Sequence, residues 1–270
     1  MGLGLSAENG LTLQALETLK FSDLVYLEDY TSLIPDFDPV KLSASIGKEV
    51  KLVTRFNLEE EGGEEILERA TRTTVCLAVP GDPFIATTHI YLRNEAQKNG
   101  VPVLYVPGVS IYPAAYSLAG LQIYKSGSSA TIVEPTPLYH PRIQYRKAFT
   151  NLVNGLHTFF FLDINRAEGK MMSFSQAAKL LENGLAEFEV ETGNLIGVGL
   201  RQVGSPKQVA RAASLKELQQ VRDDNFPQCL ILPGKLDDIE AKALMFLGAN
   251  EKLIVDHAKA IEKISGKIHF

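Results

Sequence analysis

Short apolar runs alternate with stretches of helical periodicity over the first hundred residues. The runs are typical of buried strands and cover residues 24–27, 50–53, 75–79 and 101–106. The segments between them show the periodicity and end signals of helices at 38–47, 57–69 and 88–99. Asp38 and Pro39 provide an N-cap and a first-turn proline, and Gly47 and Gly100 close two of the helices. This order predicts a mostly parallel sheet covered by helices.

The second half repeats the alternation with different pieces. We expect strands at 130–133, 157–162, 195–200 and 229–232. A capping box at 173–176 opens a helix to about 188, Ser214 caps a short helix, and Asp237 or Asp238 starts a helix that runs through 247. A helix at 112–118 links the halves. The prediction is an α/β protein with an N-terminal α/β domain at 1–110 and a C-terminal α/β domain at 111–270, and clefts between such domains are common small-molecule sites.

The segment from Gly81 to His89 is the most informative stretch of the chain. It begins Gly-Asp-Pro directly after the expected strand at 75–79 and leads into a helix. In open α/β sheets such junctions lie at the carboxyl ends of the strands, where ligands bind. Asp82 would then place a carboxylate on a rigid rim. An ordinary turn with a helix-capping aspartate explains the same three residues equally well.

Composition restricts the class of protein. Apolar residues make up 45% and charged residues 22% of the 270 residues, as in ordinary globular proteins. A net charge of −5 argues against a nucleic-acid partner. Cys76 and Cys229 lie in apolar runs, so we expect two buried thiols and no metal site. No signal peptide or membrane span is recognisable, which favours the cytoplasm and a reducing compartment.

Gly2-Leu3-Gly4-Leu5 resembles the beginning of a dinucleotide-binding fingerprint. The pattern G-x-G-x-x-G requires glycine at position 7, which is Ala7 here. Glu28, at the end of a strand, stands where a ribose-binding acid would be in a Rossmann protein. Because the phosphate-binding turn is incomplete, a nicotinamide enzyme is disfavoured.

Ser110 follows the strand at 101–106; its backbone N–H can hold a carboxylate, and it can at the same time be the N-cap of the next helix. His89 lies nearest the Gly-Asp-Pro turn, where it could face a substrate. We expect a structural role for His157, which has no carboxylate partner at a telling spacing, and surface positions for the remaining histidines, His140, His257 and His269. These residues alone do not name a reaction.

Taken together, the motifs do match a known family. The pieces are Gly2 to Leu5, residues 12–19, 25–28 and 30–32, Gly81 to His89, Val109-Ser110-Ile111, residues 120–125, 154–158 and 162–164, Val198-Gly199, and Pro233 to Leu236. In this order, and over nearly the whole chain, they resemble the diphthine synthases of the tetrapyrrole-methylase superfamily. GDP-x-x-ATTH together with GLQ-x-YK is the specific part of the pattern.

The resemblance implies two α/β domains with S-adenosylmethionine (product S-adenosylhomocysteine) bound between them. It implies a methyltransferase of diphthamide biosynthesis that modifies the amino group of a 3-carboxy-3-aminopropyl-histidine on elongation factor 2, and a homodimer. By the family pattern the cofactor contacts fall on Leu5, Asp82, Ile85, Ser110, Ile111, Leu162, Leu200 and Gln228. Weaker candidates for the substrate face are Tyr30, His89, Tyr112 and Lys125. No residue is assigned as catalytic base.

The sequence departs from the family pattern at three places. The family has a few more apolar residues before Gly-Leu-Gly-Leu, so we expect an incomplete first strand and a less certain position for Leu5. Gln228 and Asp237 stand where many relatives carry histidine. Two alternatives stay open: a related methyltransferase acting on a small molecule or RNA, and an inactive binding module.

Overall fold

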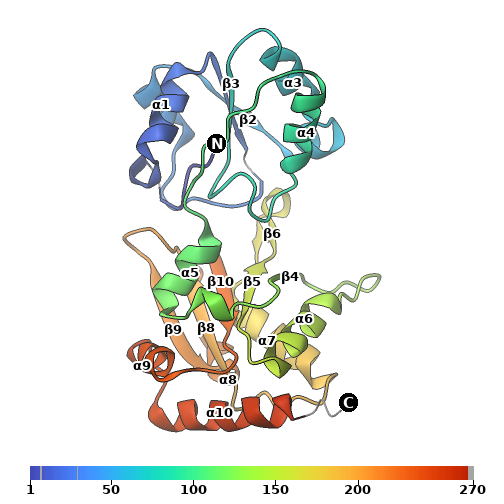
Figure 1. Ribbon diagram of the computed structural model, residues 1–270, viewed down its shortest axis with the longest axis vertical. Helices are drawn as coiled ribbons and strands as arrows, with labels where there is room; N and C mark the ends of the chain where they lie inside the picture. The colour runs from blue at the N-terminus through green and yellow to red at the C-terminus, as the bar shows by residue number, and fades with distance from the viewer. Residues whose placement is uncertain (7, 29, 267–270) are drawn as a thin grey trace. The chain divides into compact units, whose positions relative to one another are not determined.

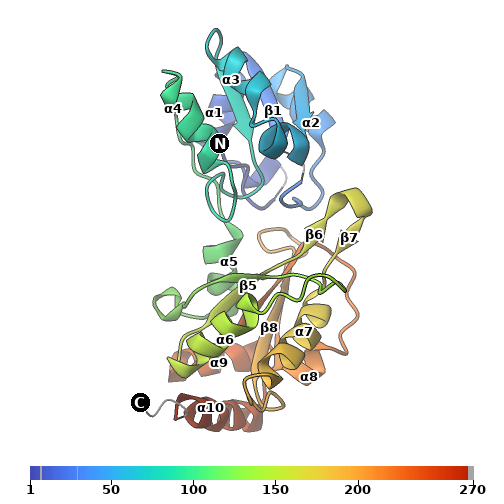
Figure 2. The same ribbon diagram turned by 90° about the vertical axis from the view of Figure 1, so that its right-hand side faces the viewer.

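The computed structural model describes residues 1–6, 8–28 and 30–266 and divides into two compact units (Figures 1 and 2). The first unit comprises Met1–Ile111 together with Gly204–Pro206. The second comprises Tyr112–Val203 and the described residues from Lys207 onward. Each unit has a sheet and a hydrophobic core of its own.

A three-stranded parallel sheet forms the centre of the first unit. Its strands are β1 (Leu24–Glu28), β2 (Val50–Val53) and β3 (Val75–Ala78), in the order β2-β1-β3. The helices are α1 (Leu13–Phe21), α2 (Pro39–Ile46), α3 (Glu64–Ala70) and α4 (Ile90–Lys98), preceded by a 3-10 turn η1 (Glu8–Gly10). The parallel arrangement predicted for this half is confirmed.

Both faces of this sheet are covered. One face packs against α1 and α2 through a cluster that includes Leu19, Val25, Leu27, Leu42 and Cys76. The opposite face packs against α3 and its neighbours through a cluster that includes Tyr26, Val53, Leu58 and Ile66. Adjacent residues of β1 thus point to opposite cores, as the pleat of a strand requires. This burial on both sides explains the nearly continuous apolar runs.

Two predictions for this half are wrong. Residues 101–106 are extended but form no strand, because most of their length has no hydrogen-bonded neighbour. The single helix expected at 57–69 is instead a π-helical turn η2 (Phe56–Glu60) followed by α3. Gly62 and Gly63 separate the two with φ of 62° and 71°, a left-handed conformation that a helix does not admit.

A five-stranded mixed sheet forms the second unit. Its order is β4-β5-β10-β8-β9, and only the β4–β5 pair is parallel. The strands are β4 (Ala130–Ile132), β5 (Thr158–Leu162), β8 (Ile196–Arg201), β9 (Val209–Ser214) and β10 (Gln228–Leu232). A small hairpin of β6 (Ile164–Asn165) and β7 (Lys170–Met171), with a 3-10 turn η4 (Arg166–Glu168), follows β5.

Helices cover both faces of the mixed sheet as well (Figure 1). One core is built with α6 (Ile143–Val153), α7 (Phe174–Ala186), α8 (Leu215–Leu218) and α10 (Glu251–Ser265). On the other face α5 (Ile111–Ala119) packs Tyr112 and Tyr116 against Phe159 of β5. The 3-10 turn η3 (Ile123–Lys125) and α9 (Asp238–Phe246) complete the unit, and no helix among the described residues is long and apolar enough to cross a membrane.

His257 corrects a further expectation. It was assigned to the surface from the sequence, but its side chain is fully buried on α10. Nδ1 accepts a hydrogen bond from Ile196 N–H at 3.1 Å, so Nε2–H is the donor to the Gly234 carbonyl at 2.9 Å. Burial lowers the pKa of His257 to about 4. The second sheet therefore uses a neutral imidazole to join β8 to the loop after β10. His140 is exposed as expected, and His269 lies outside the described residues.

We predict that this histidine makes stability depend on pH. Between its ordinary pKa of about 6.5 and its folded value, the unfolded chain binds a proton that the folded chain does not. The free energy of unfolding should therefore fall as pH falls through this window, by up to about 3 kcal/mol. Urea unfolding at pH 7.5 and pH 5 measures the change. The His257→Gln variant, which keeps one donor and one acceptor, should show a clearly smaller drop; an unchanged drop contradicts the assignment.

Candidate functional site

Four glycines, Gly2, Gly4, Gly81 and Gly108, bring the loops of the first unit into direct backbone contact. Gly4 and Gly81 exchange hydrogen bonds of 3.1 and 2.8 Å between their backbone groups. A Cβ on Gly108 would lie 2.0 Å from the Gly81 carbonyl oxygen, and one on Gly2 would lie 2.4 Å from the same atom. Only glycine permits such an approach. The glycines of Gly-Leu-Gly-Leu are therefore needed for packing at the carboxyl end of β3.

Asp82 ties two loops together at this edge. Its side chain is 5% exposed, and Oδ1 accepts a hydrogen bond from Phe84 N–H at 3.0 Å, as in a capped turn. Oδ2 accepts from the Tyr105 hydroxyl at 2.6 Å and from Gly108 N–H at 3.3 Å. The hydrogen bond to Asp82 raises the pKa of Tyr105 to about 12. The carboxylate predicted on the rim is present, and its oxygens order the rim itself.

The other positions expected in the first unit lie around this contact. Leu5 follows Gly4 and is half-buried, and Ser110 is buried two residues after Gly108, directly before α5. Ile111, the first residue of α5, is half-buried. Ile85 is 43% exposed in the loop that follows Asp82. The next residue, Ala86, has φ of 58°, which lies in the left-handed region and is strained for a residue other than glycine. Such strain persists only where the surrounding structure holds the backbone in place.

A second polar cluster lies at the end of β1. The buried Glu28 carboxylate accepts hydrogen bonds from Tyr30 N–H, Thr31 N–H and the Thr31 hydroxyl, and His89 Nε2 lies 3.6 Å from Glu28 Oε2. Burial opposes the charge on Glu28, but these hydrogen bonds outweigh it and lower its pKa. Tyr30 packs edge-on to His89, with ring centroids 6.3 Å apart. His89 is only 4% exposed, and its side chain is buried beside Glu28.

Three further expected positions meet at one edge of the second sheet. Cys229 of β10 pairs with Phe161 of β5 on one side and with Leu200 of β8 on the other. Because β10 runs antiparallel to both, Gln228 at its start lies beside the ends of β5 and β8, where Leu162 and Leu200 are found. Sequence positions 162, 200 and 228 are thus neighbours in the fold.

The amide of Gln228 is already engaged within the chain. Its Oε1 accepts a hydrogen bond from Phe174 N–H at the start of α7, at 2.8 Å. Its Nε2 donates to the carbonyls of Asp223 and Asn225, at 2.8 and 3.0 Å. The side chain therefore fixes the loop before β10.

Sequence reasoning missed a buried cluster at the opposite end of the second sheet. Glu240 of α9 is fully buried and accepts hydrogen bonds from Gln122 N–H at 2.9 Å and Asp237 N–H at 3.1 Å, and it pairs with Lys125. His157 Nε2 lies 2.9 Å from Glu240 Oε1. Burial opposes its charge, but these partners outweigh the burial and lower the pKa of Glu240. No spacing in the sequence signals this cluster, because Glu240 lies 83 residues from His157.

The contacts within this cluster show what His157, Asp237 and Lys125 do in the structure. His157 Nδ1 accepts from Gly234 N–H at 2.9 Å, so Nε2–H donates to Glu240 and the ring is neutral; burial lowers its pKa. The structural role expected for His157 is confirmed. Asp237 caps α9, and Lys125 is held by Glu240. Because Lys125 is held by the buried Glu240, its side chain has a structural role in this unit. The Tyr112 hydroxyl lies 2.6 Å from the Ser126 hydroxyl.

Comparison with known families identifies the architecture. Residues 1–219 match the model of the Tetrapyrrole (Corrin/Porphyrin) Methylases. The chain belongs to the tetrapyrrole methylase family. It is a methyltransferase with the α/β fold of that family, as the sequence predicted.

Several relatives of this chain are named diphthine synthase. A diphthine synthase of Staphylothermus marinus is 36% identical over 253 residues, which cover 92% of each chain. One of Methanosarcina acetivorans is 34% identical over 264 residues, which cover 96% of this chain and 98% of the relative. A crystal structure of diphthine synthase superposes with a TM-score of 0.85 at 28% identity, over 94% of this chain and 97% of the other. These matches confirm the resemblance to diphthine synthases.

A second solved structure agrees. It is described as a putative diphthine synthase from Entamoeba histolytica and gives a TM-score of 0.83 at 29% identity, over 93% of this chain and 97% of the other. The motifs that suggested this group fall into two sets in the structure. Gly81 to His89 and Val109 to Ile111 shape the edge of the first sheet, while residues 120–125, 154–158 and 233–236 build or adjoin the Glu240 cluster.

We predict that the glycine contact is indispensable to the methylase fold of the first unit. In Gly108→Ala the new Cβ would collide with the backbone of Gly2 and Gly81, and the free energy of unfolding should fall by about 3 kcal/mol or more. Gly193→Ala is the matched control: no atom lies within 4 Å of its Cβ, and it should change stability by less than about 1 kcal/mol. Denaturant unfolding measures the free energy of unfolding of both variants. Equal values for Gly108→Ala and Gly193→Ala would contradict the prediction.

Proposed function

We propose that this methyltransferase is a diphthine synthase that uses S-adenosylmethionine to methylate the amino group of the 3-carboxy-3-aminopropyl-histidine of elongation factor 2. The observation that carries the proposal is the match to proteins of that name at 34–36% identity over more than nine tenths of the chain. The same motifs stand at defined structural positions in both units. The proposed methyl acceptor is thus a modified side chain of a translation factor.

The residues of the first unit fit such a cofactor. Gly81 carries no side chain, and an atom at its Cβ position would meet only the Val109 carbonyl oxygen, at 3.9 Å, so a ligand can approach the main chain closely there. Ile85 and Val109 are 43% and 50% exposed and provide apolar surface beside it. Backbone N–H groups after Gly108 can donate to a carboxylate. We therefore keep Leu5, Asp82, Ile85, Ser110 and Ile111 as the proposed contacts of this unit.

In the second unit the proposed contacts are Leu162, Leu200 and Gln228. The first two side chains are apolar and buried at the strand ends. Gln228 contributes by holding the loop before β10 in place, since its amide is bonded to Phe174, Asp223 and Asn225. These residues would shape an apolar wall and exclude water from it.

When bound, S-adenosylmethionine would supply an already activated methyl group on a sulfonium for in-line attack by the neutral acceptor amine, with S-adenosylhomocysteine as the leaving group and the proton passing to water. The chain's main task is then to hold the reacting atoms in line and about 3–3.5 Å apart. Asp82 and Glu28 have their carboxylate oxygens bonded to backbone and hydroxyl groups, so both serve to order loops. We propose that orientation dominates the rate and that neither of these carboxylates acts as the base.

The first prediction concerns the cofactor. Asp82→Ala removes the hydrogen bonds to Phe84, Tyr105 and Gly108 and should weaken S-adenosylmethionine binding by about tenfold or more, measured by calorimetry. Asp38→Ala is a matched control, because Asp38 also precedes a proline and accepts from the N–H two residues on, at 2.8 Å, but caps α2. It should leave the affinity unchanged. Equal affinities of the two variants would remove Asp82 from the proposed site.

The second prediction concerns the acceptor. With labelled S-adenosylmethionine, the protein should transfer methyl groups to elongation factor 2 that carries the 3-carboxy-3-aminopropyl-histidine. Elongation factor 2 with unmodified histidine is the control and should stay unlabelled, because it lacks the amine. Labelling of a tetrapyrrole or of RNA instead would favour another activity of the same family. Absence of cofactor binding at micromolar concentration would favour an inactive binding module.

Two finer expectations belong to this proposal. We propose a homodimer, supported by exposed apolar side chains on η3 and α9 of the second unit: Tyr124 is 89%, Ile239 73% and Phe246 92% exposed. Gln122 and Lys125 bond to Asp237 and Glu240, so η3 lies against the first turn of α9. Sedimentation velocity measures the state directly, and a monomer would contradict it. The cytoplasm is proposed because elongation factor 2 acts there.

A further inference from the structure

The loops that follow the three parallel strands of the first unit meet at one carboxylate, that of Glu59. This residue lies on η2, after β2, and its Oε1 accepts hydrogen bonds from the Tyr30 hydroxyl at 3.3 Å and the Thr88 hydroxyl at 3.1 Å. Tyr30 follows β1, and Thr88 belongs to the loop after β3. The carboxyl ends of parallel strands share one edge of a sheet, where ligands bind in open α/β folds. Glu59 thus joins the three loops at the edge that also holds Asp82.

The guanidinium of Arg55, directly before η2, is held in place by the same residues. Its Nε lies 3.6 Å from Glu59 Oε2, and its Cζ lies 5.3 Å from the centre of the Tyr30 ring. The side chain is 64% exposed. Among the residues that the structure describes, none accepts a hydrogen bond from its two terminal nitrogens. The planar group is therefore oriented through Nε and open to a ligand at its outer edge.

This arrangement differs from an ordinary surface ion pair. Exposed pairs between residues i and i+4 contribute little to stability. Arg72 and Glu68 form such a pair at the end of α3, 3.5 Å apart, with side chains 76% and 70% exposed. Glu59 is only 30% exposed and is bonded to hydroxyls of two other loops, and Tyr30 is 9% exposed. Arg55 therefore rests on a fixed base, which lowers the cost of ordering it around a ligand.

The acceptor proposed above carries a group that such a cation fits. The 3-carboxy-3-aminopropyl arm has a carboxylate on the same carbon as its amine. Because the amine must be neutral to attack, the carboxylate is the full charge by which the arm can be held during the reaction. A guanidinium binds a carboxylate through two parallel hydrogen bonds, which an ammonium cannot do. Holding the carboxylate would also fix the position of the neighbouring amine, as in-line transfer requires.

We propose that Arg55 binds the carboxylate of this arm and selects acceptors in which it is free; the inference rests on the proposed function. β1 lies between β2 and β3, so the ends of β2 and β3 are about 10 Å apart. The guanidinium crosses part of this span, because it lies over Tyr30 at the end of β1. Asp82 and Thr88 belong to one loop, so the loop proposed to contact the cofactor also binds Glu59. Arg55 is the binding residue, and Glu59 positions it.

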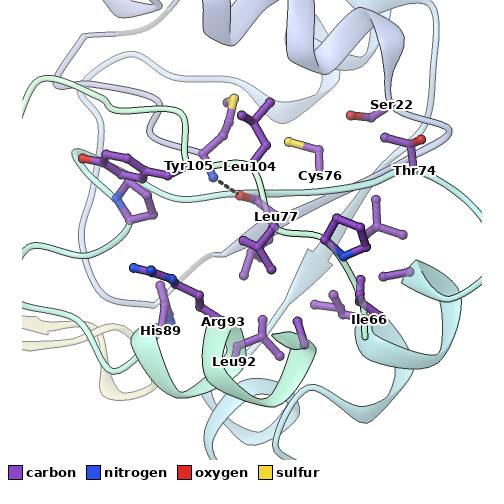
Figure 3. Close-up of a pocket in the computed structure, with 18 of the residues that line it drawn as sticks. Ser22, Ile66, Thr74, Cys76, Leu77, His89, Leu92, Arg93, Leu104 and Tyr105 are labelled. Atoms are coloured by element: carbon purple, nitrogen blue, oxygen red, sulfur yellow. Dashed lines mark hydrogen bonds between the residues drawn. The ribbon is translucent and has the colours of Figure 1, made fainter. Parts of the chain in front are cut away.

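A second arginine of the first unit also lies over a ring. Arg93 of α4 has its Cζ 5.7 Å from the centre of the Phe84 ring. It lines a groove of about 390 Å³ between β3 and the extended segment 101–105 (Figure 3). Most of the side chains around this groove are apolar, and an apolar groove does not favour the entry of a charged arm. Arg93 is therefore the rival that an experiment has to separate from Arg55.

The test measures methyl transfer from labelled S-adenosylmethionine to two forms of elongation factor 2, one with the carboxylate arm and one with its carboxamide. The unchanged protein should prefer the carboxylate in kcat/KM by about tenfold to a hundredfold. Arg55→Gln should remove this preference, mainly by raising KM for the carboxylate form. Arg55→Lys keeps the charge without the planar group and should keep part of the preference. The affinity for S-adenosylmethionine, measured by calorimetry, should stay unchanged in both variants.

Arg72→Gln is the matched control, because it removes an exposed guanidinium of the same kind of ion pair, and it should leave the preference unchanged. A preference that survives in Arg55→Gln, or that is lost in Arg93→Gln instead, would overturn the assignment of Arg55. So would equal transfer to both forms by the unchanged protein. In each of these cases the transfer itself still supports the proposed function, so the two can fail separately. A protein that labels neither form contradicts both.

Discussion

Contact between bare backbone segments is the constraint on which the candidate site depends. Gly2 and Gly108 approach the Gly81 carbonyl oxygen so closely that neither position leaves room for a Cβ, and Asp82 links the same loops through three hydrogen bonds. The two devices reinforce one another, because the close approach sets the loop positions and the carboxylate holds them. Ser110 is buried two residues after Gly108. The positions of the loops at this edge of the first sheet are thus set by backbone contacts, and the Asp82 side chain stabilises them by hydrogen bonds.

The second unit separates its two tasks along one sheet. At one end of β10, Gln228 fixes a loop beside the proposed contacts. At the other end, a buried carboxylate and two neutral imidazoles tie the loop at Gly234 to α9, α10 and β8. A buried, fully bonded polar network rigidifies its surroundings. The rigid network holds the end of the second sheet that lies away from the proposed contacts. The residues around Gln228 at the other end are not needed for that network.

Local signals predicted much of this structure. Asp38 and Gly47 bound α2 as expected, the Ser173 capping box starts α7, and the Gly-Asp-Pro turn follows a buried strand. Each of these is decided by neighbouring residues. The strand β9 was missed because Val209–Ser214 is the outermost strand and lacks a strong apolar pattern. A single chain shows propensity and periodicity but not which edge a strand will meet.

The misses that matter for function are long-range contacts. His257 was assigned to the surface, and no partner was found for His157, because Ile196, Gly234 and Glu240 are remote in sequence. The two glycines at the chain start resembled a nucleotide-binding turn, whereas the structure uses them for close packing. Glycine and histidine serve packing and chemistry alike, so only tertiary structure separates the two uses.

The buried carboxylate of Glu240 has an evolutionary consequence. Segments around residues 122, 125, 157 and 237 all direct donors at it. Losing one donor strands part of a negative charge in an apolar interior, and losing the acid strands the donors. A single substitution at Glu240 or at any of its donors therefore destabilises the folded chain. These stretches should therefore be inherited together, because the acid and its donors depend on one another.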